Sequence, residues 1–433
     1  MYRRYHQIAD MVFYVFAALF SGISLIRDCV VELWGVALIN PFMMRFIFIM
    51  DWVILPVLAL MTLFLEFKDN RKERMFTIFG LLLLLTFQLN FDYLVFMDPD
   101  MFINHLIHGS SYERGIWVYF NAGTCRWGLA CLIVAAKGKD FGKIAWIYVI
   151  SQTALMLVIT ALALTGVIPD MVFAEVGRPE RHALGLHYPL NYVANWFSIA
   201  LVYCYLRKGI LKIWKYAGLI ALLAISVFVC KAQTTSVLFF VLITGTFIRQ
   251  MGWGRKLWRR EVILKCLQYS FLFFAAFMIL ASLLYVPPIS TALGSIRSLN
   301  TFLSRFEFGR TGLMEYFPTL LGVEYPISTW TGTTANEDYF FIDCSYIYEL
   351  LHCGVLVYPL MMALLWYIPH RLYKKRQGYA LGILALFACI CAMEHHLADA
   401  SFNIFWFMVF ARLDDADQPR DVAALSSSSK STS

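Results

Sequence analysis

The chain has 433 residues, of which 60% are hydrophobic and 15% charged, with a formal net charge of +7. Soluble domains are about 45–50% apolar and about 25% charged, so this composition excludes an ordinary soluble protein. The basic residues cluster in short segments between apolar runs and give no indication of a nucleic-acid partner.

Apolar runs recur along the whole chain and predict an all-α, polytopic integral membrane protein. About 20 apolar residues are enough for a helix to cross a hydrocarbon core ~30 Å thick. The runs predict about twelve spans within a single membrane domain, residues 1–412, followed by a disordered cytoplasmic tail at 413–433. The expected spans are roughly 8–26, 45–66, 75–93, 115–136, 144–166, 188–206, 216–230, 232–248, 263–285, 346–368, 378–394 and 402–412.

Lysine and arginine alternate between successive connecting segments, which predicts the orientation of the chain. Cytoplasmic segments of membrane proteins carry the excess of basic residues, so both termini are expected in the cytoplasm. The basic segments are 3–4, 68–74, 137–143, 207–215, 249–260 and 371–376. This alternation places segment 286–345 on the outer face, as one large extracytoplasmic loop.

Segment 286–345 is the longest polar interval in the chain and is expected to carry function. Loops longer than about 12–15 residues without structure of their own are usually functional or disordered. Disordered segments contain few aromatic residues, whereas this one contains many, so we expect a folded loop with short helices.

Three arginines on the predicted outer face, Arg181, Arg305 and Arg310, suggest a site for phosphate or diphosphate. The guanidinium group offers a planar fork of donors that suits phosphate oxygens. A single arginine near a bilayer is more often a headgroup anchor, so the prediction depends on several converging. No nucleotide-binding loop or metal motif is convincingly placed, so we expect no cofactor and no metal, and a substrate that carries its own activated bond.

Four motifs in chain order resemble those of bacterial polysaccharide polymerases of the Wzy type, within the O-antigen polymerase–ligase superfamily. Segment 181–191 (RHALGLHYPLN) is similar to the family's R-x-x-L-G-F-x-H-P-N segment, with His187 and Asn191 each shifted relative to Pro189. Segments 303–305 and 320–322 resemble its S-G-R…L-F-G pattern. Segment 342–346 with Gly354 resembles its D-N-S-Y…G segment, with Cys344 in place of asparagine, and Glu394 with residues 402–403 resembles the closing segment.

The resemblance implies a glycosyltransferase that polymerises undecaprenyl-diphosphate-linked repeat units into capsular or exopolysaccharide at the outer face of the cytoplasmic membrane. The expected partners are this lipid-linked oligosaccharide, membrane lipids, and assembly proteins such as a flippase and a chain-length regulator. The arginines would bind the departing diphosphate, and His187 or Asp343 would act as the base. Further candidate site residues are Asn191, His395, His396 and Asn403.

Several alternatives remain open from the sequence. Asp343 suits a helix cap as well as a catalytic role, and the pair His395–His396 suits an interfacial polar pair. A ligase that transfers a lipid-linked glycan to another acceptor has nearly the same requirements at the outer face. A transporter or flippase predicts polar residues in the middle of spans, where this chain has Arg45, Asp51 and Arg126.

Overall fold

The computed structural model describes residues 2–33, 46, 49–64, 71–97, 126–174, 179–252, 258, 260–286, 297–323 and 342–413. Within these residues the chain is mostly helical, with one two-stranded antiparallel hairpin. The predicted tail beyond Leu413, much of the predicted large loop and Arg45 lie outside the described residues.

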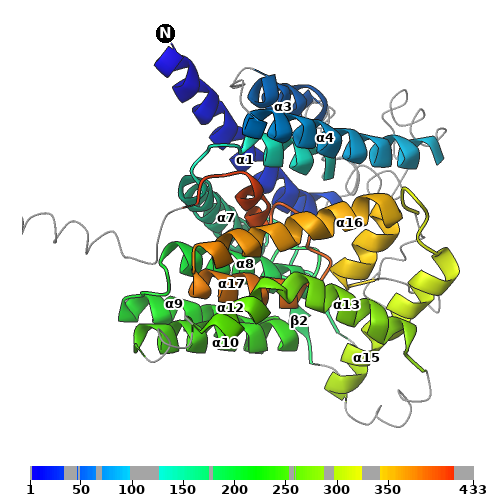
Figure 1. Cartoon of the computed structure of the whole chain (residues 1–433). Helices are drawn as coiled ribbons and strands as arrows, with labels where there is room; N and C mark the ends of the chain where they lie inside the picture. The colour runs from blue at the N-terminus through cyan, green and yellow to red at the C-terminus, as the bar shows by residue number, and fades with distance from the viewer. Residues whose placement is uncertain are drawn as a thin grey trace, which may run out of the picture.

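The helices follow most of the predicted apolar runs (Figure 1). In the first half they are α1 (Tyr2–Leu33), η2 (Met50–Ile54), α3 (Leu55–Phe64), α4 (Arg71–Met97), the unlabelled helix Arg126–Ala135 and α7 (Phe141–Leu164). Strands β1 (Val172–Phe173) and β2 (Arg181–His182) form the hairpin. The later helices are α8 (Pro189–Leu206), α9 (Ile213–Ala224), η3 (Ile225–Val229), α10 (Gln233–Gln250), α12 (Glu261–Gln268), α13 (Ser270–Leu283), α15 (Arg297–Thr311), η4 (Gly312–Tyr316), α16 (Ser345–Lys374), α17 (Gly378–Cys391) and η5 (Ile404–Val409).

Three of the described helices, α1, α7 and α16, are long and apolar enough to cross a membrane. The pair α12 and α13, bent by 53°, makes a fourth if it counts as one broken span. Large apolar side chains such as Ile213, Phe228 and Leu284 are exposed on the surface, which is unusual for a soluble protein. The expectation of a helical, multi-pass membrane protein is thus supported, whereas twelve spans are not shown among the described residues.

The segment 402–412, predicted as the twelfth span, does not form a spanning helix. It contains η5, a 3₁₀-helix of six residues. At a rise of about 2.0 Å per residue such a helix is only about 12 Å long. Its side chains are all buried, so its apolar character comes from packing inside the protein.

The basic connecting segments gather at one end of the bundle. Lys139 Nζ lies 2.5 Å from Asp10 Oδ1 of α1, and its backbone oxygen accepts from Arg412 N at 2.7 Å. Arg371, near the end of α16, donates to the carbonyl oxygens of Val409 and Ala411 at 2.9 and 3.0 Å. The first turns of α1 and the last described residues therefore lie at the same end of the bundle.

The opposite end of the bundle brings together the starts of α8 and α16 and the end of α17. α17 packs against α8, α13 and α16, and α13 packs in turn against α15 (Figure 1). α15 and η4 lie within the predicted large loop, which contains short helices as expected. The predicted outer segments thus meet at the end of the bundle away from the basic residues.

Candidate functional site

Arg305 of α15 links two segments at the end of the bundle away from the basic residues. Its Nε donates to the carbonyl oxygen of Met393 at 3.1 Å, and its Nη2 lies 3.7 Å from Asp343 Oδ2. Met393 follows α17, and Asp343 immediately precedes α16. The arginine of the predicted large loop is therefore buried against two segments that the sequence had also singled out.

Arg181 enters the same cluster from the hairpin that precedes α8. Its side chain is buried, and its Cζ lies 5.6 Å from the ring centre of Tyr188. Burial raises the pKa of the Tyr188 hydroxyl, Arg181 opposes this rise, and the carboxyls of Asp343 and Glu394 add to it. Because both carboxyls and Arg181 act on one hydroxyl, segments 181–188, 343–345 and 393–394 converge there.

A tight turn directs the chain from β2 into α8. Asp170 accepts from Leu184 N at 2.7 Å, and its other oxygen lies 2.6 Å from His182 Nδ1. Gly185 follows with a φ of +91°, a left-handed conformation that favours glycine. Pro189 then occupies the first turn of α8, where a missing N–H costs no hydrogen bond. The turn places Tyr188 at the N-cap position of α8.

Two carboxyl groups lie beside Arg305. The side chain of Asp343 is 36% exposed, whereas Glu394 is only 3% exposed. Burial raises the pKa of both, and Arg305 opposes the rise in both. For Glu394, burial together with the neighbouring Asp343 raises the pKa to about 8. Two carboxyls that interact with each other and with one cation do not ionise independently, so the pair retains a proton to a higher pH than two isolated carboxyls would.

The three histidines predicted for the site lie in two different surroundings. His187 and His395 interact electrostatically, and burial, opposed by Asp399, lowers the pKa of His395 to about 4. His396 is buried and stacks on Phe402, with ring centres 3.6 Å apart and an angle of 8° between the planes. His187 and His395 therefore lie together near the cluster, while His396 packs inside the protein.

Two other predicted residues, Arg310 and Asn403, do not join the arginine cluster. Arg310 is exposed and lies five residues after Arg305, which at about 100° per residue places it on another face of α15. Asn403 donates to the carbonyl oxygen of Leu397 at 2.7 Å, as does Trp406 Nε1, and so holds the turn after α17. Asn191 is buried in the first turn of α8.

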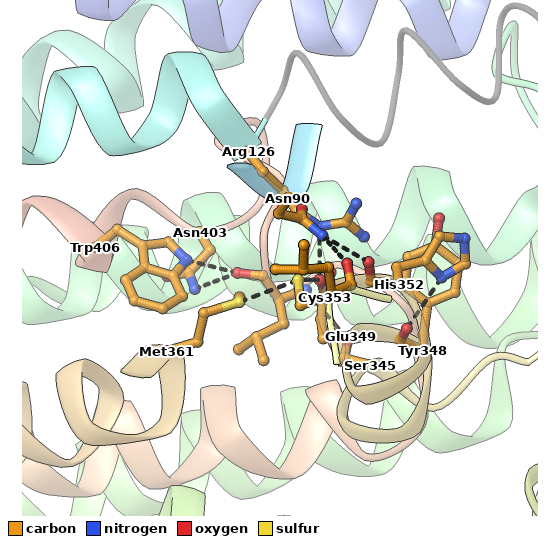
Figure 2. Close-up of polar contacts among 12 residues, drawn as sticks. Asn90, Arg126, Ser345, Tyr348, Glu349, His352, Cys353, Met361, Asn403 and Trp406 are labelled. Carbon is orange, nitrogen blue, oxygen red and sulfur yellow. Dashed lines mark hydrogen bonds and ion pairs between the residues drawn. The ribbon is translucent and has the colours of Figure 1, made fainter. Parts of the chain in front are cut away.

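The mid-span charge at Arg126 has a partner in α16. Arg126 Nε lies 2.8 Å from Glu349 Oε2, and both side chains are nearly inaccessible to solvent (Figure 2). Asp51 is also buried, and its charge acts on the thiol of Cys131. Arg126 and Glu349 thus form a pair between helices within the bundle.

Two glycines from the family-like motifs meet where α16 is broken. Gly354 has a φ of +69° and Gly322 a φ of +108°, and a Cβ atom on either would overlap backbone atoms at this crossing. Val355 N and Leu356 N donate to the carbonyl oxygens of residues 319 and 320, both at 3.0 Å. Asn90 of α4 donates to Leu321 O at 2.5 Å and to His352 O at 3.1 Å (Figure 2). Segment 319–323 therefore provides acceptors for the backbone N–H groups of α16 that have no partner within the helix because of the break.

Sequence reasoning left two members of the cluster out of the site, Tyr188 and Glu394. Tyr188 lies between His187 and Pro189, and Glu394 directly precedes the histidine pair, so position beside a predicted site residue was the available signal. An acidic residue close to a long apolar run is costly without a role, which is a second signal for Glu394.

Among the described residues, no group of three or more His, Cys, Asp or Glu side chains is arranged to hold a metal ion. Comparisons with protein families, with curated proteins and with solved structures give no match for this chain. The arrangement of charged groups is therefore the basis for a functional proposal.

Proposed function

We propose that this protein is a membrane glycosyltransferase that polymerises lipid-diphosphate-linked oligosaccharide repeat units at the outer face of a bacterial cytoplasmic membrane. The observation that carries the proposal is the convergence of Arg181 and Arg305 with Asp343 and Glu394 at one end of the helix bundle. The resemblance of these segments to polysaccharide polymerases supplies the substrate class.

The reaction needs a leaving diphosphate and a base. The hydroxyl oxygen of the acceptor sugar forms a bond to the anomeric carbon of the donor while the carbon–oxygen bond to the diphosphate breaks. The electron pair leaves on the diphosphate, where Arg181 and Arg305 stabilise the developing charge. Asp343 takes the hydroxyl proton, since its side chain is partly exposed. Burial raises its pKa, which makes it a stronger base, and Arg305 opposes this rise. His187 is the alternative base.

The charge balance of the cluster suits an anionic donor. Arg181 and Arg305 bring two guanidinium groups to the two carboxyls, and burial opposes the ionisation of both carboxyls. An entering diphosphate would be attracted to the two guanidinium groups, in surroundings where electrostatic interactions are less screened than in water.

The two rival functions differ in what they require. A ligase would use the same donor site with a different acceptor, so the identity of the acceptor distinguishes it. A flippase or transporter would need charged groups accessible to its cargo in mid-membrane. Arg126 and Glu349 instead neutralise each other in a buried pair, which favours a structural role for these charges.

The direct test is polymerisation by the purified protein in lipid vesicles. Lipid-diphosphate-linked repeat units should be converted to a ladder of longer lipid-linked glycans, with release of lipid diphosphate. Formation of a single product only when a second acceptor is added would assign a ligase instead. Transfer of the intact lipid across the bilayer without glycan extension would assign a flippase.

A further inference from the structure

Glu394 is a buried carboxyl group in an unusual setting. Its side chain is 3% exposed, and its Oε1 atom has no hydrogen-bond partner among the residues that the structure describes. The nearby cation Arg305 is already shared with Asp343 and with the carbonyl oxygen of Met393. An ionised carboxylate with so little compensation is expensive to bury, so the geometry itself favours the neutral acid.

The backbone around Glu394 holds this side chain in place. Ser345 Oγ, at the start of α16, donates to the carbonyl oxygen of Glu394 and accepts from Leu397 N at 3.2 Å. Arg305 Nε fixes the preceding carbonyl of Met393. The segment after α17 is therefore tied to both α15 and α16, and the Glu394 carboxyl interacts electrostatically with Arg305 and Asp343.

We propose that Glu394 acts as a neutral carboxylic acid and donates its O–H to the diphosphate of the substrate, beside Arg305 and Arg181. The proposal rests on the proposed function, because it assigns a third ligand to the diphosphate of the donor. A neutral donor adds a hydrogen bond without adding a charge. An ionised Glu394 would instead repel the diphosphate and compete with it for Arg305.

Because Glu394 must be protonated to donate a hydrogen bond, the proposal predicts how diphosphate binding depends on pH. Burial and the charge of Asp343 raise the pKa of Glu394 to about 8, and Arg305 opposes the rise. Among the described residues, Tyr188 interacts electrostatically with Glu394 and with Arg181. His395 and His396 follow Glu394 in the chain. Burial raises the pKa of Tyr188 and lowers the pKa of both histidines. Diphosphate binding should therefore weaken as the pH rises through 8, because Glu394 loses its donor and gains a negative charge.

The test measures binding of inorganic diphosphate to the full-length protein by titration calorimetry at pH 7 and pH 9. Glu394→Gln keeps a hydrogen-bond donor and cannot ionise, so it also controls for the ionisation of the ligand itself. The wild-type affinity should fall about tenfold more than that of Glu394→Gln between these pH values, as linkage to one group titrating near 8 requires. Glu307→Gln, at an exposed position of α15, is the matched control and should follow the wild type.

Asp343→Asn provides a second variant. Because Asp343 contributes to the raised pKa of Glu394, its removal should move the loss of affinity to lower pH. Parallel pH dependence in the wild type and Glu394→Gln, or no diphosphate binding by the wild type, would overturn the proposal. If the pH-dependent binding is found but no glycan is extended in vesicles, the anion site stands and the polymerase proposal falls.

Discussion

Arg126 and Glu349, 223 positions apart in the chain, form an ion pair of 2.8 Å in which both side chains are almost completely buried. The Sγ atom of Cys353, one turn further along α16, also donates to Glu349 Oε2 at 3.3 Å. A charge on either residue alone would lie unpaired inside the bundle, so each residue requires the other.

Removing one partner of this pair should destabilise the protein strongly. Arg126→Met leaves Glu349 buried without its cation, and we expect a loss of about 3–5 kcal/mol in the free energy of unfolding. The double variant Arg126→Met/Glu349→Leu should recover most of this loss, because neither charge is then buried alone. Unfolding in detergent by urea, followed by tryptophan fluorescence, measures both. A double variant no more stable than the single one would show that the pair is not the cause.

The crossing of Gly322 and Gly354 should not tolerate a side chain. Gly354→Ala places a Cβ against the backbone of segment 319–322 at a positive φ, and the combined overlap and strain should cost on the order of 3 kcal/mol or more. Gly218→Ala is the control: its Cβ would meet nothing within 4 Å, and in a helix alanine is favoured by about 0.5–1 kcal/mol. Equal yields and melting temperatures for the two variants would contradict this account.

If Arg305 and Arg181 each bind the diphosphate through the planar fork of the guanidinium group, a lysine at either position should not support normal activity. Arg305→Lys keeps the charge but loses the bidentate geometry, so we expect at least a tenfold fall in kcat/KM for polymerisation, about 1.4 kcal/mol. Arg310→Lys is the matched control on the same helix, since Arg310 is exposed and lies on another face. The assignment fails if Arg305→Lys produces polymer at the wild-type rate and chain length.

The predicted orientation is tested with two single cysteines at opposite ends of the bundle. Glu180 and Lys212 are both exposed, and each is replaced by cysteine in a background without native cysteines. A membrane-impermeant maleimide should label Glu180→Cys on intact cells and Lys212→Cys only after the membrane is opened. The reverse pattern would place the arginine cluster on the cytoplasmic side and remove the proposed reaction from the outer face.

The rate of polymerisation and its dependence on pH distinguish Asp343 from His187 as the base. Burial raises the pKa of Asp343, and a base acts only when it is deprotonated, so activity should be lost as the pH falls through that raised value. Asp343→Asn should lower the rate by more than about tenfold, a barrier change of ~1.4 kcal/mol, and remove this acid limb. His187→Ala should retain a near-normal rate and the limb. Loss of the limb in His187→Ala instead would assign the base to histidine.

Local sequence patterns predicted most of the described helices. The twelve predicted spans, however, are not shown among the described residues. The apolar runs identify α1, α7 and α16 because hydrophobicity over about 20 residues is a local property. The same reasoning was wrong for residues 402–412, because an apolar run buried in protein and one facing lipid have the same composition. The sequence alone does not separate these two surroundings.

By itself, the sequence determined a helical membrane protein with arginines and carboxylates concentrated in a few polar segments, since composition and spacing are properties of the chain. Only the tertiary structure decided which of these groups meet: it joined Arg181 and Arg305 to Asp343, added Tyr188 and Glu394, and left Arg310 apart. It also paired Arg126 with Glu349. The physical reason is that a charge interacts over a few ångströms of space, and the protonation of a carboxyl depends on its burial and neighbours.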